Sequence, residues 1–464
     1  MKRSLTLAIS LSLGAAVLFG MPCARAQSTV KPFFMFSCSA TTKVCPQGED
    51  PSSLMQSADG NFYGTAEFGG SGNKAAGTVF KLTPAGKLSV IHTFVADSNG
   101  NFPTGANPTN LVEGNDGFLY GTTLNGGANA FGVVFRMSKT GVTHVLHSFC
   151  SLANCADGDQ PFTLVLGSNG NFYGCTTNSF PPTLFRLTTS GTYTLLHTFN
   201  FSVDGSQCVG IISASDGNIY GSTAGGLSFP TILFGMTPAG QMSTLHNWRY
   251  PQFPFSSITQ TSDGRIWGVL TGVHVGSGGP GMFGIDLSGN GYQEVLLPYP
   301  RPDSVRFITQ ASDGNFWGTV GNEIVSFTLG GESLQQIQIT GTSGSAPISL
   351  LQASDGRLLG LTNNFGTTGS DPGEIFTIEP ALGAPKPEFV TFSPASGKAG
   401  SQVMIRGTHF VGTTAVKFNG VSAAFHVLNT GTILTTVPTG ATTGPITVVN
   451  KGGQANSTTH YTVE

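Results

Sequence analysis

The sequence predicts an all-β protein, a seven-bladed β-propeller followed by a small β-sandwich. Three observations in its 464 residues support this prediction. A turn followed by an aromatic residue and a glycine recurs seven times along most of the chain. Glycine is abundant, at 65 residues, whereas charged residues make up only 10%. No long helical periodicity follows the N-terminal segment, so the pattern is typical of a turn-rich β protein.

Residues 1–26 predict a signal peptide. A basic start, Met-Lys-Arg, is followed by an apolar run over 5–20 and by Ala-Arg-Ala, after which cleavage is expected. One alternative is a lipid anchor on Cys23, although the preceding Met-Pro fits a lipobox poorly. The other is an uncleaved membrane helix, for which the run is short. We therefore expect a secreted, periplasmic or cell-surface protein whose mature chain has no transmembrane segment.

Six cysteines remain after this cleavage, and an even number in an exported chain indicates disulfides. Two close pairs occupy matching places in the repeat, and the third pair follows by elimination. The alternative is six free buried thiols, which an oxidising compartment disfavours. The predicted disulfides are Cys38–Cys45, Cys150–Cys155 and Cys175–Cys208.

The repeat is clearest in its first copy, Asp-Gly-Asn-Phe-Tyr-Gly at 59–64. Successive copies begin 57, 53, 47, 47, 50 and 42 residues apart, a period that suits a four-stranded propeller blade. Six or eight blades are alternatives, because the last three copies are degenerate. The seven turns begin at Asp59, Asp116, Asn169, Asp216, Asp263, Asp313 and Asp355.

Each copy divides into four strands. The first ends at the Asp-Gly turn, the second carries the aromatic residue and the glycine, and in the first copy the third and fourth cover 77–82 and 88–94. The last copy stops after its third strand, at 374–378, while a lone strand at 31–36 opens the mature chain. This lone strand is expected to complete the last blade and close the ring, which removes an unpaired edge.

The repeat resembles the GloVer-type tandem repeat of exported bacterial proteins, on its Asp-Gly-Asn-Phe-Tyr-Gly core and on Gly-Thr-Val-Phe-Lys-Leu at 77–82. The resemblance weakens in the fifth to seventh copies. It assigns 28–380 to the propeller and implies no activity.

The composition changes after a Gly- and Pro-containing linker at 381–387. Short alternating strands separated by Gly and Pro turns fill 388–464, which suits a β-sandwich. Val-Met-Ile-Arg-Gly-Thr-His-Phe at 403–410 and Gly-Pro-Ile-Thr-Val at 444–448 resemble an IPT/TIG immunoglobulin-like domain. The resemblance implies a role in spacing or interaction.

Several kinds of chemistry are disfavoured. A net charge of −3 argues against a nucleic-acid partner, which needs a basic surface. The histidines of the fourth strands, such as His147 and His197, would lie too far apart for a shared metal and are expected to pack or form hydrogen bonds. Asp97 begins a calcium-like loop, but Pro108 occupies its twelfth position. The turn carboxylates are expected to point to solvent. No catalytic residue, metal ligand or cofactor is predicted.

The innermost strands offer the last test for an acid/base pair. Three residues before each turn, only Glu113 can ionise, so a polar ring is expected to line the channel without such a pair. The repeat is also similar to that of streptogramin lyase, but the His and Glu cluster of that family has no counterpart here. A polysaccharide or lactone lyase or hydrolase is therefore the alternative function. The channel-lining candidates are Gln56, Glu113, Gln260, Gln310 and Gln352.

The connections between second and third strands and between fourth and first strands are long and variable, and in a meander blade they share one face. Variable loops on a rigid scaffold commonly carry recognition. The sequence therefore predicts a non-catalytic, monomeric binding or adhesion scaffold that recognises an extracellular glycan or protein at this face. The contact candidates, which could equally pack the loops, are Phe68, Phe102, Phe131, Phe162 and Phe229.

Overall fold

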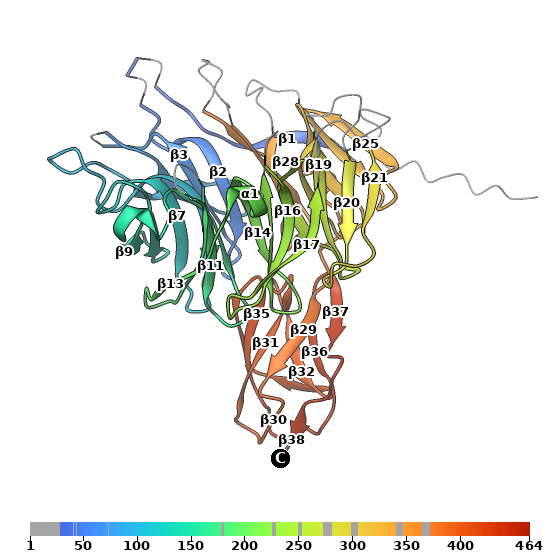
Figure 1. Ribbon diagram of the computed structural model, residues 1–464. Helices are drawn as coiled ribbons and strands as arrows, with labels where there is room; N and C mark the ends of the chain where they lie inside the picture. Colours follow the sequence, from blue (N-terminus) through green and yellow to red (C-terminus); the bar gives the residue numbers. More distant parts are fainter. Residues whose placement is uncertain are drawn as a thin grey trace, which may run out of the picture.

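The computed structural model describes residues 28–39, 41–42, 44–72, 74–177, 181–224, 229–248, 253–271, 281–297, 305–339, 347–363 and 372–464. The predicted signal peptide and the loop at 272–280 lie outside these ranges. Seven four-stranded sheets form a ring, and a β-sandwich lies at one end of it (Figure 1). The prediction of seven blades and a β-sandwich is therefore confirmed.

Each blade is an antiparallel meander, and consecutive strands are neighbours. Blade 1 contains β2 (Glu49–Gln56), β3 (Phe62–Phe68), β4 (Thr78–Leu82) and β5 (Leu88–Thr93). Blade 2 contains β6 (Ala106–Glu113), β7 (Leu119–Asn125), β8 (Val133–Met137) and β9 (Thr143–Ser148). Blade 3 contains β10 (Pro161–Leu166), β11 (Phe172–Thr176), β12 (Thr183–Leu187) and β13 (Tyr193–Thr198). Blade 4 contains β14 (Gln207–Ser213), β15 (Ile219–Ala224), β16 (Thr231–Met236) and β17 (Met242–Trp248).

The remaining blades follow the same order, except for the last. Blade 5 contains β18 (Phe253–Gln260), β19 (Ile266–Thr271), β20 (Gly281–Ile285) and β21 (Gln293–Leu296). Blade 6 contains β22 (Val305–Gln310), β23 (Phe316–Val320), β24 (Glu323–Phe327) and β25 (Ser333–Gln338). Blade 7 contains β26 (Pro347–Gln352), β27 (Leu358–Thr362), β28 (Glu374–Glu379) and β1 (Thr29–Met35).

The chain closes the ring as predicted, because β1 pairs with β28 as the outer strand of blade 7. The antiparallel register runs from Thr29 opposite Glu379 to Met35 opposite Glu374. Phe36, next to β1, is almost fully buried, and its ring lies 5.5 Å from that of Phe80 in blade 1. The N-terminal strand therefore links the last blade to the first.

The Asp-Gly turns are tied to the aromatic residue of the second strand. Asp59 Oδ1 accepts a hydrogen bond from the Asn61 backbone N–H (3.0 Å), and its Oδ2 accepts one from the Tyr63 hydroxyl (2.9 Å). The same tyrosine–aspartate bond joins Tyr120 to Asp116 at 2.7 Å. Asp59 and Asp116 are exposed, as expected, and each also serves as the acceptor that the buried tyrosine needs for its hydroxyl.

The glycine of the repeat makes room for an aromatic ring on the third strand. A Cβ added to Gly121 would lie 2.4 Å from Phe135 Cζ and 2.6 Å from the Asn110 carbonyl oxygen. Phe135 is itself fully buried, beside Tyr63, Val79 and Phe94 of the preceding blade. The hydrophobic core therefore lies between the blades, and each repeat packs against its neighbours.

The sandwich consists of two four-stranded sheets and one short parallel pair. One sheet contains β29 (Glu388–Ser393), β31 (Gln402–Thr408), β35 (Thr432–Thr436) and β34 (Phe425–Asn429). The other contains β33 (Val421–Ala423), β32 (Ala415–Phe418), β36 (Ile446–Asn450) and β37 (Gly453–Asn456). The parallel pair is β30 (Ser396–Gly397) with β38 (Thr462–Val463).

The sandwich adjoins the end of the propeller that carries the short Asp-Gly turns, opposite the long loops (Figure 1). Asn429 donates a side-chain hydrogen bond to Asn115 Oδ1 (2.8 Å), and the Ser312 hydroxyl donates one to the Gly383 carbonyl (2.6 Å). The first bond joins the sandwich to the propeller, and the second joins the linker to blade 6. Among the described residues, no helix is long and apolar enough to cross a bilayer.

Candidate functional site

The predicted channel-lining residues lie at the junctions between blades. Each accepts, at 2.8 Å, a hydrogen bond from a backbone N–H in the Asp-Gly turn of the preceding blade. Gln56 of blade 1 reaches Ser354 of blade 7, so this bond also spans the closure of the ring. The acceptor–donor pairs are Gln56–Ser354, Glu113–Ala58, Gln260–Ser215, Gln310–Ser262 and Gln352–Ser312. Gln56, Glu113 and Gln260 also border the central cavity.

Glu113 is the one acidic residue among these predicted channel-lining residues. It is almost fully buried, its Oε1 lies 2.6 Å from Lys139 Nζ, and it also accepts a bond from the Ser57 hydroxyl (2.9 Å). These contacts keep the carboxylate satisfied and fix it between two blades. The geometry assigns it to blade packing rather than to proton transfer.

A cavity of about 1020 Å³ lies at the turn end of the channel, between the propeller and the sandwich. The inner strands form its walls, and β29, β31 and the β34–β35 turn contribute its other side. The wall residues that the sequence analysis did not identify lie one position before the channel-lining position. We call that channel-lining position, three residues before each Asp-Gly or Asn-Gly turn, the glutamine column. These wall residues are Met55, Val112, Val165, Ile212, Thr259 and Leu351.

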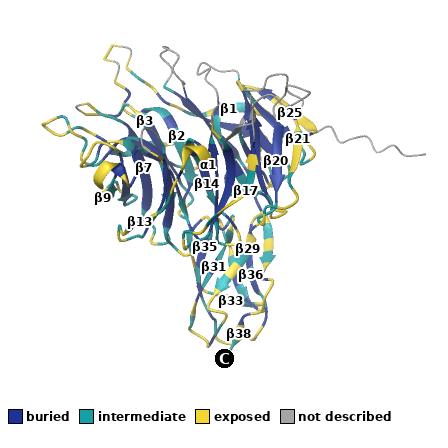
Figure 2. Ribbon diagram, viewed as in Figure 1, coloured by how far each residue is buried: buried dark blue, intermediate teal, exposed yellow. Residues whose placement is uncertain are grey.

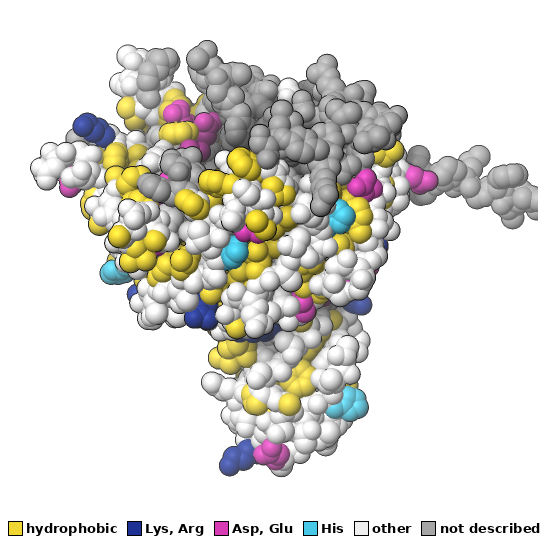
Figure 3. Space-filling model, in the orientation of Figure 1, with side chains coloured by type: hydrophobic (Ala, Val, Ile, Leu, Met, Phe, Trp, Pro, Cys, Tyr) yellow, Lys and Arg dark blue, Asp and Glu magenta, His cyan; other side chains and the backbone are white. Residues whose placement is uncertain are grey.

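The opposite end of the propeller carries the long loops, and exposed residues concentrate in these loops and the turns (Figure 2). Hydrophobic side chains are exposed among them (Figure 3). Four predicted contact residues, Phe68, Phe131, Phe162 and Phe229, are 37–41% exposed, whereas Phe102 is half-buried. We call this region the long-loop face; its exposed large apolar residues are Met35, Val44, Phe68, Val95, Phe131, Leu152, Phe162, Phe201, Val203 and Phe229.

The connections that follow blades 2 and 3 carry exposed apolar residues that the sequence analysis did not identify. The short helix α1 (Phe201–Asp204) presents Phe201 and Val203, and Val203 is 59% exposed. The Phe201 ring lies 5.8 Å from that of Phe229, so two connections form one apolar surface. Leu152 is 52% exposed on the preceding fourth-to-first connection. Apolar residues inside otherwise polar connections were the signal available in the sequence.

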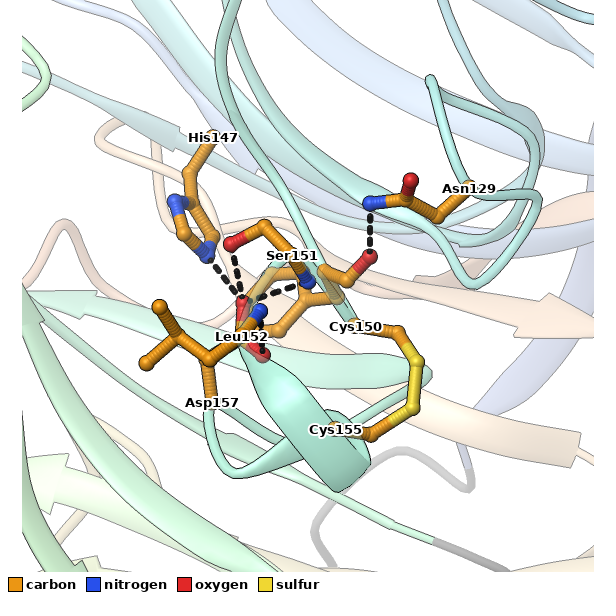
Figure 4. The surroundings of a disulfide bond; sticks show 8 residues. Asn129, His147, Cys150, Ser151, Leu152, Cys155 and Asp157 are labelled. Carbon is orange, nitrogen blue, oxygen red and sulfur yellow. Dashed lines mark hydrogen bonds and ion pairs between the residues drawn. A yellow bond between two sulfur atoms is a disulfide. The ribbon is translucent and has the colours of Figure 1, made fainter.

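A buried carboxylate holds the connection that displays Leu152 (Figure 4). Asp157 is fully buried and accepts bonds from the Ser151 N–H (3.0 Å), the Ser151 hydroxyl (2.7 Å) and the Leu152 N–H (3.2 Å). His147 Nε2 lies 3.0 Å from the same carboxylate. The histidine of the fourth strand thus helps to fix the loop that follows it.

The same connection holds unusual backbone conformations. Residues with positive φ other than glycine cost about 1–2 kcal/mol each, and they persist only where surrounding contacts fix them. The Cys150–Cys155 disulfide and the Asp157 bonds supply such contacts here. Strained backbone of this kind concentrates at functional sites. The positive-φ residues of this connection are Cys150, Asn154, Cys155 and Gln160.

Blade 3 repeats the arrangement without a disulfide across the loop. His197 Nε2 lies 3.0 Å from Asp204, and the same carboxylate accepts the Asn200 N–H at 2.9 Å. The predicted role of these histidines in hydrogen bonding is confirmed. Each His–Asp pair joins an outer strand to a connection that presents apolar residues.

All three predicted disulfides are present: Cys38–Cys45, Cys150–Cys155 and Cys175–Cys208. The last joins blade 3 to blade 4, while the first two close short loops at the long-loop face. Glu49 Oε2 lies 3.1 Å from Cys45 Sγ, but both sulfurs of that pair are in a disulfide. They are therefore unavailable as thiolate ligands.

Acid is expected to destabilise the protein. Burial lowers the pKa of His92 and of His147 below the ordinary 6.5, although Asp157 partly opposes the shift at His147. At these two histidines the unfolded chain then binds more protons than the folded chain below pH 6.5, so their contribution to stability falls as the pH drops below that value. The midpoint of urea unfolding should be lower at pH 5 than at pH 7.

His92 should contribute measurably, because its buried Nε2 has no hydrogen-bond partner and would carry a proton below its lowered pKa. His92→Gln should therefore reduce the difference between the two midpoints, whereas His144→Gln, at an exposed position, serves as the control. Equal midpoints at pH 5 and 7 would contradict this account.

Comparisons with known proteins bear on both parts of the chain. Residues 50–283, half of the chain, match the family model described as the Gloeobacter/Verrucomicrobia repeat. Residues 387–463 match the IPT/TIG domain model. No curated protein matches the sequence.

Several solved structures share the fold at low identity. Catalytically inactive virginiamycin B lyase from Staphylococcus aureus, with quinupristin, has a TM-score of 0.53 at 16% identity, over 76% of this chain and 99% of that one. The extracellular domain of a B. thetaiotaomicron protein named as a hybrid two-component system scores 0.51 at 14% identity, over 92% and 53%. PorZ, a surface component of the type-IX secretion system of Porphyromonas gingivalis, scores 0.53 at 13% identity, over 92% and 61%.

Proposed function

The chain belongs to the Gloeobacter/Verrucomicrobia repeat family and carries an IPT/TIG domain, and we propose that it is an exported, non-catalytic binding scaffold. Its long-loop face binds a partner outside the cell. One observation carries the proposal. The fourth-to-first connections of blades 2 and 3 present exposed apolar residues, and a His–Asp pair with a buried carboxylate fixes each connection.

The chemistry of this face favours a protein partner over a glycan. Its most exposed apolar members in blades 2 and 3, Leu152 and Val203, are aliphatic and offer no flat ring to a sugar. Contiguous exposed apolar surface marks protein interaction sites. A glycan that stacks on Phe162 and Phe229 is the other outcome that the experiment below distinguishes.

An extracellular setting has independent support. Disulfides persist in oxidising compartments, and this chain has three. Two of the structures that share its fold are an extracellular domain and a bacterial surface component. The sequence of residues 1–26 has the form of a signal peptide.

The lyase alternative lacks a matching site in the described residues. The S. aureus lyase becomes inactive when one histidine is replaced by alanine. No histidine that the structure describes borders the central cavity of this chain, and Glu113 is engaged by Lys139. These observations favour binding over lactone or polysaccharide cleavage.

Binding should be sought on arrays of extracellular glycans and of bacterial envelope proteins, with cleavage products measured in parallel. Phe201→Ser combined with Phe229→Ser should weaken binding of the identified partner at least tenfold, about 1.4 kcal/mol, because both rings belong to the exposed surface. Val142→Ser is the matched control, since Val142 is 60% exposed in a turn outside the long loops.

Equal losses in both variants would argue against the long-loop face, and released fragments would establish catalysis instead. Binding to glycans alone would show that the partner is a sugar rather than a protein.

A further inference from the structure

The cavity between the propeller and the sandwich lies away from the long-loop face. Its volume of about 1020 Å³ is at the upper end of the range for small-molecule sites. Because residues of both parts of the chain border it, a ligand held there would contact the propeller and the sandwich together.

The propeller side of the cavity is a largely apolar collar. It consists of the half-buried residues one position before the glutamine column, and all but Thr259 are apolar. Partly exposed apolar side chains in a concave site gain free energy when a ligand covers them, at about 25 cal/mol per Å². The collar residues are Met55, Val112, Val165, Ile212, Thr259 and Leu351.

On the sandwich side, the cavity is bordered by a cationic side chain whose hydrogen-bond partners are neutral. Arg406 of β31 borders the cavity, and its guanidinium donates to Thr432 Oγ1 (3.4 Å) and contacts Met404 Sδ (3.3 Å). Burial lowers the pKa of Arg406, which shows the cost of desolvating its charge. No ion pair among the described residues includes it, so several of its five N–H donors remain open to an anion.

The carboxylates around the cavity are engaged elsewhere. Glu113 is paired with Lys139, Asp216 accepts the Tyr220 hydroxyl at 2.7 Å, and Glu388 accepts the Thr408 hydroxyl at 3.0 Å. Thus each of these carboxylates has a partner within the protein, whereas Arg406, with the neutral partners Thr432 and Met404, belongs to no ion pair among the described residues.

We propose that this cavity binds an amphipathic carboxylic acid, whose carboxylate pairs with Arg406 and whose apolar part lies within the collar. The site is separate from the long-loop face and requires both parts of the chain. A carboxylate and a guanidinium form two parallel hydrogen bonds, which makes the head group specific.

The test uses the full chain with octanoate, decanoate and dodecanoate, and with decan-1-ol as the neutral analogue. Titration calorimetry should detect binding of the carboxylates and weaker binding of the alcohol. Arg406→Gln should weaken decanoate binding at least tenfold, Arg406→Lys should restore part of it, and Ile212→Asn should weaken the acid and the alcohol alike. Lys417→Gln is the control, because Lys417 is a cation of the sandwich that does not border the cavity.

Failure of all three acids to bind would overturn the proposal, and so would equal decanoate affinity in wild type and Arg406→Gln. Thermal unfolding of each variant checks that it is folded. The Phe201→Ser/Phe229→Ser variant should bind decanoate normally, which separates this site from the long-loop face.

Discussion

Removal of residues 28–36 is expected to abolish folding of the propeller to a stable monomer. The deletion removes β1, exposes the backbone edge of β28 and uncovers the core shared by blades 7 and 1. An open ring presents a long unpaired strand, which is a site for aggregation. Size-exclusion chromatography should show aggregates, or thermal unfolding should begin well below that of the full chain.

A point variant keeps this prediction measurable if the deletion yields no protein. Phe36→Ala should lower the free energy of unfolding by about 3–5 kcal/mol, as is usual for a buried phenylalanine. Lys31→Ala, on the same segment but in an exposed ion pair with Glu379, should cost less than about 1 kcal/mol. Equal stability of the full chain, the deletion variant and Phe36→Ala would show that β1 does not close the ring.

Asp157→Ala is expected to destabilise the folded conformation of the connection at 150–160, which is part of the long-loop face. The substitution leaves the Ser151 and Leu152 N–H groups and the His147 ring without their acceptor. Leaving a buried polar group without its hydrogen-bond partner costs about 1–3 kcal/mol. Limited proteolysis should cut this connection faster, and binding at the face should weaken.

Asp97→Ala provides the comparison, because Asp97 also accepts two backbone N–H bonds but is exposed. It should change neither the cleavage pattern of the connection nor binding. If Asp157→Ala behaved like Asp97→Ala, the buried carboxylate would not be the element that fixes the loop.

The repeat itself made the blade architecture predictable. The Asp-Gly turn, the aromatic residue and the glycine recur because every blade packs in the same way. In blade 2, for example, the absence of a side chain at Gly121 leaves room for the Phe135 ring. The lone first strand and the missing last strand implied ring closure, since an unpaired edge is costly. Cysteine spacing within the repeat likewise led to two of the disulfides that the structure contains, and the third, Cys175–Cys208, followed by elimination.

The site was less predictable, because its parts meet only in three dimensions. The glutamine column reads as a channel lining, yet Gln56 bonds to Ser354 across the ring closure, almost 300 positions away in sequence. Asp157 looks like a solvated loop residue until its partner His147 is seen beside it. Arg406 borders the cavity only because the sandwich lies against the turn end of the propeller.

Hydrogen exchange of the protein with and without its identified partner tests the central claim most directly. The account predicts that protection on binding is concentrated in the connections at 150–160 and 199–206 and around Phe229, with the sandwich unchanged. Protection confined to the sandwich or to the outer strands would contradict a binding site at the long-loop face.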